Sequence, residues 1–198
     1  MSGDAASRGI TVIGAGQMGA GIAQVAAVAG FDVTLTDVAA GQLERAMMVV
    51  QGSLTKLVEK GRLEQRDAES AVLRIRTSAE IADADLLIEA ATENVDLKLQ
   101  IFGEMNAVAS QGAILASNTS SIPITRLAAV TDRPEAVVGM HFMNPVPLMP
   151  LVEVIRGLET SDETARAVRA TMRPSPSTPV RSVMIDGWRG HPAMSSSV

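Results

Sequence analysis

The chain has 198 residues, of which 46% are hydrophobic and only 2% aromatic, and its 22 acidic and 17 basic residues give a net charge of −5. Few aromatic side chains and no basic run argue against nucleic acid or an anionic membrane as a partner. The sequence contains no Cys, which excludes disulfides and thiolate catalysis. Residues 1–8 lack the apolar core of a signal peptide, and no apolar run is long enough to span a bilayer, so we expect a cytoplasmic protein.

From residue 9 onward, apolar strand patterns alternate with amphipathic helix patterns. In chain order we expect strands at 9–13, 32–38, 85–91, 113–117, 136–141 and 151–156, and helices at 17–29, 42–60, 64–73, 96–109 and 124–129. Strands that alternate with helices imply crossover connections. The sequence therefore predicts the α/β class, with a doubly wound, mostly parallel sheet and helices on both faces.

The periodicity is lost after Arg169. Pro, Ser and Arg dominate the segment that follows, where Pro174, Pro176 and Pro179 would interrupt a helix. The few large apolar residues beyond them do not form a helical stripe and cannot offset the entropy lost on ordering. We therefore divide the chain into an α/β domain over residues 1–172 and an irregular, unpacked tail over residues 173–198.

A glycine-rich loop follows the first predicted strand and opens the first predicted helix. The run Gly14-Ala15-Gly16-Gln17-Met18-Gly19 has GxGxxG spacing, and Asp37 ends the second strand about 20 residues later. In such a loop the first glycine permits the turn, the second leaves room for a pyrophosphate and the third lets helix and strand pack closely. The helix N-terminus then faces the phosphates. These residues predict a Rossmann-type, dinucleotide-binding domain.

Asp37 favours NAD over NADP. Its carboxylate would accept hydrogen bonds from the ribose hydroxyls and repel the extra phosphate of NADP, and no Arg follows it directly. The alternative is a glycine turn with an ordinary surface acid. Strand, turn, helix, strand and acid agree with one another, so we expect NAD as the cofactor.

Two later segments resemble a known family. The runs Ser117-Asn118-Thr119-Ser120-Ser121 and His141-Phe142-Met143-Asn144-Pro145-Val146-Pro147, followed by Glu153, closely resemble L-3-hydroxyacyl-CoA dehydrogenases, including bacterial 3-hydroxybutyryl-CoA dehydrogenases. The resemblance extends from Ile10 to Arg169. It implies an oxidoreductase of fatty-acid metabolism that interconverts short-chain (S)-3-hydroxyacyl-CoA and 3-oxoacyl-CoA by hydride transfer with NAD.

The resemblance also implies catalytic roles. His141 would be the general base, a role that imidazole suits because it titrates near neutral pH. Glu153 would orient the ring and stabilise the imidazolium. Ser120 would hydrogen-bond the substrate oxygen and, with Asn144, help to place the nicotinamide. The alternatives are a core histidine at a strand end and an acid at a strand edge.

Four more residues match family positions that contact ligands. Glu93 and Lys98 match positions at NAD, and the alternative is a helix N-terminal acid with a solvated lysine. Ser53 and Lys60 match positions at the coenzyme A part, where Lys60 would meet a phosphate, and the alternative is a solvated helix face. We assign no metal ligands.

The chain departs from the family in its tail. Family members continue into a C-terminal helical domain that supplies a catalytic asparagine and the dimer interface, and residues 186–191 do not match its start. A truncated or out-of-frame reading would give such a tail. Without those helices apolar surface and the cleft would meet water, so we expect NAD binding more firmly than turnover.

Two alternatives to an active 3-hydroxyacyl-CoA dehydrogenase stay open. One is a catalytically impaired NAD-binding remnant, or a structural relative such as the lens λ-crystallins. The other is a hydroxy-acid dehydrogenase of the 3-hydroxyisobutyrate or 6-phosphogluconate type, which shares the glycine loop but uses a lysine base. The run from His141 to Pro145 argues against the second.

Overall fold

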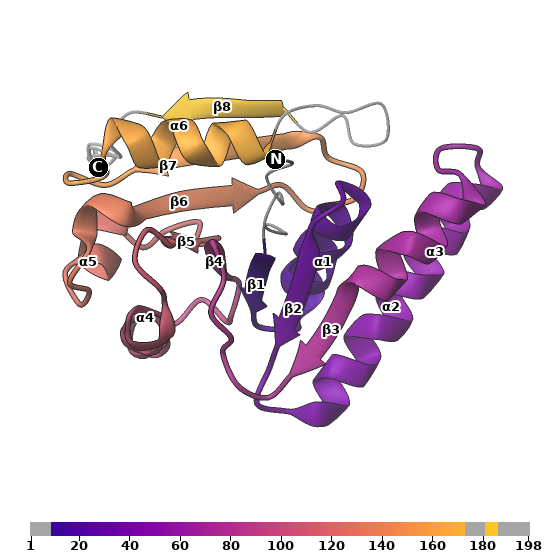
Figure 1. Ribbon diagram of the computed structural model, residues 1–198, viewed down its shortest axis with the longest axis horizontal. Coiled ribbons are helices and arrows are strands. Elements are labelled where there is room, and N and C mark those ends of the chain that lie inside the picture. The colour runs from indigo at the N-terminus through magenta and orange to yellow at the C-terminus, as the bar shows by residue number, and fades with distance from the viewer. Residues whose placement is uncertain (1–8, 173–180, 186–198) are drawn as a thin grey trace, which may run out of the picture.

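The computed structural model describes residues 9–172 and 181–185. Within these residues eight strands form one sheet in the order β3-β2-β1-β4-β5-β6-β7-β8 (Figure 1). The strands are β1 (Gly9–Ile13), β2 (Asp32–Thr36), β3 (Ile75–Ser78), β4 (Leu86–Glu89), β5 (Ile114–Ser117), β6 (Val137–Phe142), β7 (Leu151–Arg156) and β8 (Arg181–Ile185). All neighbours pair in parallel except β6 and β7, which are antiparallel. The predicted doubly wound α/β class is confirmed.

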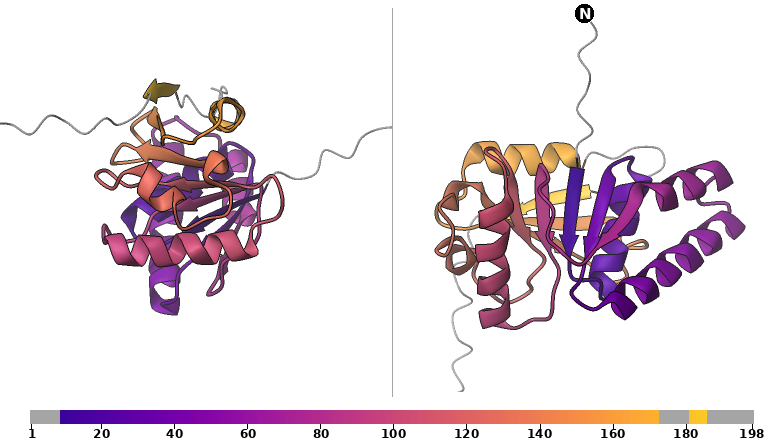
Figure 2. Two further views of the ribbon diagram at one scale, coloured as in Figure 1. Left: turned by 90° about the vertical axis from the view of Figure 1, so that its left-hand side faces the viewer. Right: turned by 60° about the horizontal axis from the view of Figure 1, so that its bottom comes forward.

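Helices cover both faces of the sheet (Figure 2). They are α1 (Gln17–Val28), α2 (Ala40–Glu59), α3 (Gln65–Arg74), α4 (Val95–Val108), α5 (Ile124–Ala128) and α6 (Asp162–Thr171), with a short 3-10 helix, η1 (Pro134–Ala136). α1, α2, α3 and α6 bury one apolar layer, to which the strands contribute Val12, Leu35 and Val138. α4 and α5 bury the other layer, against Ile13, Leu87 and Leu115. No helix among the described residues has the length and apolarity needed to cross a membrane.

The chain reverses its direction of winding at β1. β2 lies on one side of β1 and β4 on the other, so the loops that leave β1 and β4 at their carboxyl ends diverge. Open α/β sheets bind nucleotides outside the carboxyl ends of the strands at such a switch point. The loop with the GxGxxG spacing lies at this place.

Besides the short 3-10 helix η1, three elements were not predicted from the sequence. β3 is only four residues long and directly follows α3, so the apolar pattern does not separate the two. α6 begins at a side-chain cap, because Ser161 Oγ accepts a hydrogen bond from the backbone N–H of Thr164 at 3.0 Å. Val168 then turns its side chain into the core.

The third element, β8, corrects the prediction for the tail. The prediction of irregular structure is wrong for residues 181–185, which pair with β7 in a register from Leu151↔Arg181 to Ile155↔Ile185. Pairing with the edge strand β7 satisfies the backbone N–H and C=O groups of these residues. Local sequence patterns do not predict such pairing. Residues 173–180 and 186–198 lie outside the described residues, and the division into a domain at 1–172 and a tail stays a prediction.

The glycine-rich loop joins β1 to α1 through a close backbone contact. Gly14 adopts φ +100°, which L side chains rarely adopt. A Cβ atom on Gly19 would lie 1.7 Å from the carbonyl oxygen of Gly14. A Cβ atom on Gly16 would meet nothing within 4 Å. Gly14 thus permits the turn and Gly19 the packing of α1, whereas Gly16 leaves open space beside the loop.

We expect Gly19→Ala to lower the free energy of unfolding by at least ~1–3 kcal/mol, because the added methyl group overlaps main-chain atoms that cannot rotate away. Gly103→Ala is the matched control, since a Cβ atom there meets nothing within 4 Å in the middle of α4. It should be neutral or stabilising by up to ~1 kcal/mol. Urea unfolding measures both variants, and equal stabilities would contradict the close contact.

Candidate active site

His141 and Glu153 face each other across the antiparallel pair of β6 and β7. They are direct register partners, so their side chains leave the same face of the sheet. Nδ1 of His141 lies 2.8 Å from Oε2 of Glu153, and the two side chains are 24% and 29% exposed. Because a carboxylate can only accept, Nδ1 of the neutral ring carries the proton and Nε2 is left as a proton acceptor.

Ser120 lies in the turn that follows β5, and its Oγ is 3.2 Å from Nε2 of His141. Ser120, His141 and Glu153 therefore form a continuous hydrogen-bonded chain. Ser120 is exposed and His141 half-buried, so the Nε2 end of this chain is open to a small molecule. The arrangement can take a proton from, or return one to, an oxygen atom placed beside Ser120 and His141.

Asp37 lies directly after β2 and faces the glycine-rich loop. Its carboxylate accepts hydrogen bonds from the backbone N–H groups of Ala15 and Ala39, both at 2.9 Å. Gln42 of α2 donates to the carbonyl oxygen of Ala15 at 3.3 Å. These contacts keep the acid next to the space that Gly16 leaves open, which is where a dinucleotide would bring its ribose.

Asn144 lies beside the start of α1, although it is remote from that helix in sequence. Its Oδ1 accepts a hydrogen bond from Nε2 of Gln17 at 3.3 Å. A Cβ atom on Gly21 would be 2.8 Å from Cβ of Val146, so the loop after β6 packs directly on α1. Met18 is partly buried against the core. The glycine loop and the segment after His141 are thus brought together.

Glu93 and Lys98 belong to a charge cluster centred on Glu89, the last residue of β4. Lys98 is 1% exposed, and its Nζ lies 2.6 Å from Oε1 of Glu89 and 3.5 Å from Oε2 of Glu93. The alternative interpretation of Lys98 as a solvated helix residue is wrong. The sequence analysis also missed Glu89, which is completely buried. The sequence did carry one indication of it: Glu89 ends a strand that is otherwise apolar, and a carboxylate buried there needs a partner.

The Glu93 carboxylate also accepts hydrogen bonds from the turn that contains Ser120. Partial burial raises the pKa of Glu93, but hydrogen bonds from Thr119 and Ser121 and the charge of Lys98 outweigh it, so this pKa lies below its ordinary value. The charged form therefore stabilises the fold above the ordinary carboxyl range. That contribution is lost as the pH falls through the lowered pKa.

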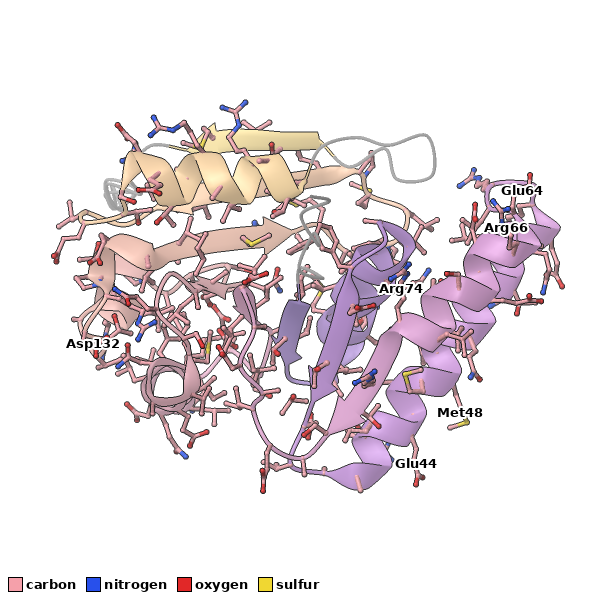
Figure 3. The ribbon with its side chains drawn as sticks, in the orientation of Figure 1. Glu44, Met48, Glu64, Arg66, Arg74 and Asp132 are labelled. Atoms are coloured by element: carbon pink, nitrogen blue, oxygen red, sulfur yellow. The ribbon has the colours of Figure 1, made fainter. Side chains whose placement is uncertain are left out.

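Ser53 and Lys60 are not brought into the His141 cluster. Ser53 lies on α2, which packs mainly against α1 and α3, and Lys60 directly follows that helix. α2 and α3 form an arm that extends from one side of the molecule, and Figure 3 shows Glu64 and Arg66 near its tip. Ser53 is half-buried and Lys60 is exposed at the end of α2.

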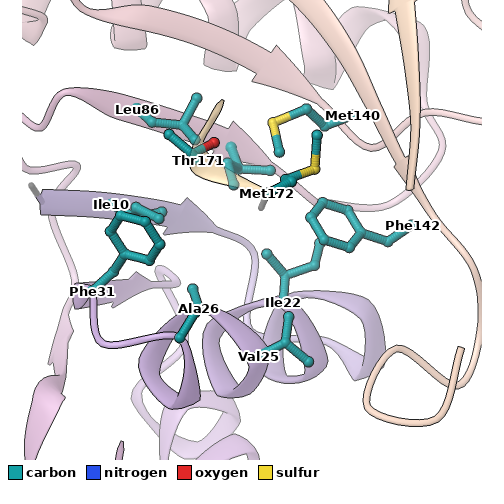
Figure 4. A pocket seen from close by; sticks show the side chains of 12 residues that line it. Ile10, Ile22, Val25, Ala26, Phe31, Leu86, Met140, Phe142, Thr171 and Met172 are labelled. Atoms are coloured by element: carbon teal, nitrogen blue, oxygen red, sulfur yellow. The ribbon is translucent and has the colours of Figure 1, made fainter. Parts of the chain in front are cut away.

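An apolar pocket lies beside α1, and Figure 4 shows Met140 and Phe142 among its lining side chains. It opens between α1 and the end of α6 and is lined by Ile22, Met140, Phe142 and Met172, among others. Successive strand residues point to opposite faces, so Met140 and Phe142 turn away from the side that His141 occupies. The pocket is therefore separate from the candidate site.

The chain is similar to proteins of one known family. The family described as "3-hydroxyacyl-CoA dehydrogenase, NAD binding domain" matches residues 9–184. The chain is 53% identical over 173 residues to the probable 3-hydroxybutyryl-CoA dehydrogenase of Deinococcus radiodurans, covering 85% of this chain and 62% of that protein. It is 53% identical over 161 residues to the 3-hydroxybutyryl-CoA dehydrogenase of Bradyrhizobium diazoefficiens, covering 80% and 55%.

Solved structures show the same likeness. The (S)-3-hydroxybutyryl-CoA dehydrogenase of Ralstonia eutropha has a TM-score of 0.84 and 42% identity, covering 91% of this chain and 64% of that chain. The 3-hydroxybutyryl-CoA dehydrogenase of Escherichia coli has a TM-score of 0.85 and 38% identity, covering 91% and 38%.

The Rossmann-type sheet, with an acid beside its glycine-rich loop, defines a protein of the dinucleotide-binding class. More narrowly, the chain belongs to the 3-hydroxyacyl-CoA dehydrogenase family and carries the NAD binding domain of that family. This membership removes the 3-hydroxyisobutyrate and 6-phosphogluconate alternatives. The chain spans 62% and 55% of the lengths of the two relatives compared above.

We expect Lys98→Met to lower the free energy of unfolding by about 3–5 kcal/mol, because it leaves the buried carboxyl group of Glu89 without its nearest cation. Lys60→Met removes the same charge at an exposed position and should change stability by less than about 0.5 kcal/mol. Chemical denaturation at neutral pH measures both. Wild-type stability of the Lys98 variant would show that the buried ion pair contributes nothing to the fold.

Proposed function

We propose that this chain provides the NAD-binding and proton-transfer part of an oxidoreductase that interconverts (S)-3-hydroxyacyl-CoA and 3-oxoacyl-CoA. The observation that carries the proposal is the hydrogen-bonded chain from Ser120 through His141 to Glu153, beside a dinucleotide loop. Relatives named 3-hydroxybutyryl-CoA dehydrogenases support a short acyl chain.

The proposed proton transfer uses the open end of this chain. Nε2 of His141 takes the proton of the 3-hydroxyl group, while Oγ of Ser120 hydrogen-bonds the same oxygen. Glu153 keeps Nδ1 protonated in the neutral ring and stabilises the imidazolium that forms. In the reverse direction the imidazolium returns the proton to the carbonyl oxygen. When bound, NAD supplies the acceptor or donor of the hydride at C3.

The residues of the glycine loop fit a dinucleotide. Gly16 leaves room for a pyrophosphate to approach the backbone, and the N-terminus of α1 presents its positive dipole there. Asp37 would exchange its backbone hydrogen bonds for ribose hydroxyls. We propose that Ser120 and Asn144 contact the nicotinamide side and that Glu93 contacts the cofactor, with buried Lys98 acting through Glu93.

For the coenzyme A part of the substrate, the carrier of its acyl chain, we propose Ser53 on α2 and Lys60, which directly follows that helix. Lys60 is exposed, so its ammonium group can pair with a phosphate of coenzyme A as a point charge. Both residues lie on the arm and not at the sheet, so they would hold the carrier while the reacting carbon lies beside His141.

A second candidate is an NAD-binding protein of this family without efficient turnover. It is favoured by the exposure of the proton-transfer chain, since Ser120 is exposed and His141 is only half-buried. A cleft that is open to water weakens the electrostatic stabilisation of the transition state. The two candidates share NAD binding and differ in catalysis, so separate measurements of each distinguish them.

We expect NADH to bind at least ~10-fold more tightly than NADPH, a difference of about 1.4 kcal/mol, because Asp37 would repel the additional phosphate. Fluorescence titration with each nucleotide measures both dissociation constants. Asp37→Asn should narrow the difference, since it removes the repelling charge and keeps the side-chain shape. Equal affinities in the wild type would contradict the role of Asp37.

We expect His141→Gln to slow the reduction of acetoacetyl-CoA by NADH by ~10²–10⁴-fold, because glutamine cannot supply the proton. The affinity for NADH should change little, and it serves as the control for folding. Turnover that is indifferent to this substitution would remove His141 from the mechanism. A wild-type chain that binds NADH but shows no turnover would support the second candidate.

A further inference from the structure

A closed circuit of hydrogen bonds and one ion pair surrounds the turn that carries Ser120, and one half of it starts at Glu89. Oε2 of Glu89 accepts a hydrogen bond from Oγ of Ser117 at 2.6 Å. Its Oε1 accepts from Nζ of Lys98 at 2.6 Å and from the backbone N–H of Ala91 at 2.7 Å. Glu89, Lys98 and Ser117 are each at most 1% exposed. This half of the circuit joins β4, β5 and α4.

The other half passes through Glu93. Nζ of Lys98 lies 3.5 Å from Oε2 of Glu93. Oε1 of Glu93 accepts from Oγ1 of Thr119 and, at 3.2 Å, from the backbone N–H of Ser120. The backbone N–H of Thr119 then donates to Oγ of Ser117 at 3.2 Å, which closes the circuit. We call this closed set of contacts the Glu89 circuit.

The Glu89 circuit and the His141 chain meet at one residue, Ser120. The backbone of Ser120 is held by Glu93 on the side of the circuit, while its Oγ lies 3.2 Å from Nε2 of His141. Hydrogen bonds to a buried charge are strong and directional, so a fully satisfied network of this kind specifies one geometry. A small displacement of Ser120 would lengthen its contact with His141.

We propose that Glu89 is a positioning residue that, through Lys98 and Ser117, holds the turn at 117–121 so that Ser120 Oγ remains within hydrogen-bonding distance of His141. The effect of Glu89 on catalysis rests on the proposed function. Its effect on the position of Ser120 does not depend on turnover. Glu89 would not touch substrate or cofactor, because it is completely buried beneath the turn.

The nitrogen resonances of the His141 ring report the contact directly. The sequence holds two histidines, His141 and His191, so replacing each in turn assigns their signals. At one fixed, near-neutral pH, Ser120→Ala should move the Nε2 resonance of His141, because a hydrogen-bond partner is lost. Glu89→Gln should move it in the same direction, because the circuit loosens and Ser120 shifts.

Two further variants serve as a second test of the circuit and as a control. Ser117→Ala opens the circuit at the neighbouring link without removing a charge, and it should move the same resonance even if Glu89→Gln folds poorly. Glu104→Gln removes a carboxylate from the exposed side of α4 and should leave the resonance in place. Circular dichroism shows that each compared variant is folded.

Activity gives a second, independent measure. In the reduction of acetoacetyl-CoA by NADH, Glu89→Gln should lower kcat by about 10–100-fold and change KM far less, because displacing a catalytic group by about 1 Å is sufficient for such a loss. A merely destabilising substitution such as Phe102→Leu in the layer under α4 should leave kcat per folded molecule near the wild-type value.

The proposal is overturned if folded Glu89→Gln or Ser117→Ala keeps the wild-type His141 resonance, or if Ser120→Ala itself does not move it. An increase in KM at unchanged kcat would also overturn it. Absence of turnover in the wild type would instead contradict the proposed function, and the resonance measurement would still decide the role of Glu89.

Discussion

The close approach of α1 to β1 is the constraint on which the rest of the molecule depends. Only glycine at position 19 allows the helix to reach the carbonyl oxygen of Gly14, and this contact fixes where the helix N-terminus lies. The same tight packing continues at Gly21, on which Val146 of the loop after β6 rests. A helix held further from the sheet would separate the nucleotide loop from the segment that follows His141.

One antiparallel pair of strands, β6 and β7, in an otherwise parallel sheet brings His141 and Glu153 together. Because β7 runs against β6, His141 and Glu153 become register partners although a turn and an irregular segment separate them in the chain. Flanking residues such as Met140 and Val154 are buried in the core on the other face. The strand alternation therefore holds the imidazole and its carboxylate at the surface while the same two strands close the core.

Much of this arrangement could be predicted from the sequence, because the relevant signals are local. The strand at 9–13, the glycine loop and Asp37 follow one another in order, and the structure has β1 at the predicted residues. The pairing of β8 with β7 could not be predicted, since it depends on an edge provided by the folded domain.

The partners of the buried charged residues could not be predicted from the sequence either. Lys98 was compatible with a solvated helix face, and only the folded chain shows that its ammonium group is enclosed by Glu89 and Glu93. Family membership could be predicted from short motifs, because their residues are constrained by chemistry.

The arm formed by α2 and α3 has a consequence for how such a protein can change. The proposed carrier-binding residues lie on the arm, whereas the Ser120, His141 and Glu153 chain belongs to the far half of the sheet. Substitutions along the exposed side of the arm, such as at Lys60, meet few constraints from the core. Recognition of the carrier and the chemistry at the reacting carbon could therefore diverge independently, as two modules within one folded unit.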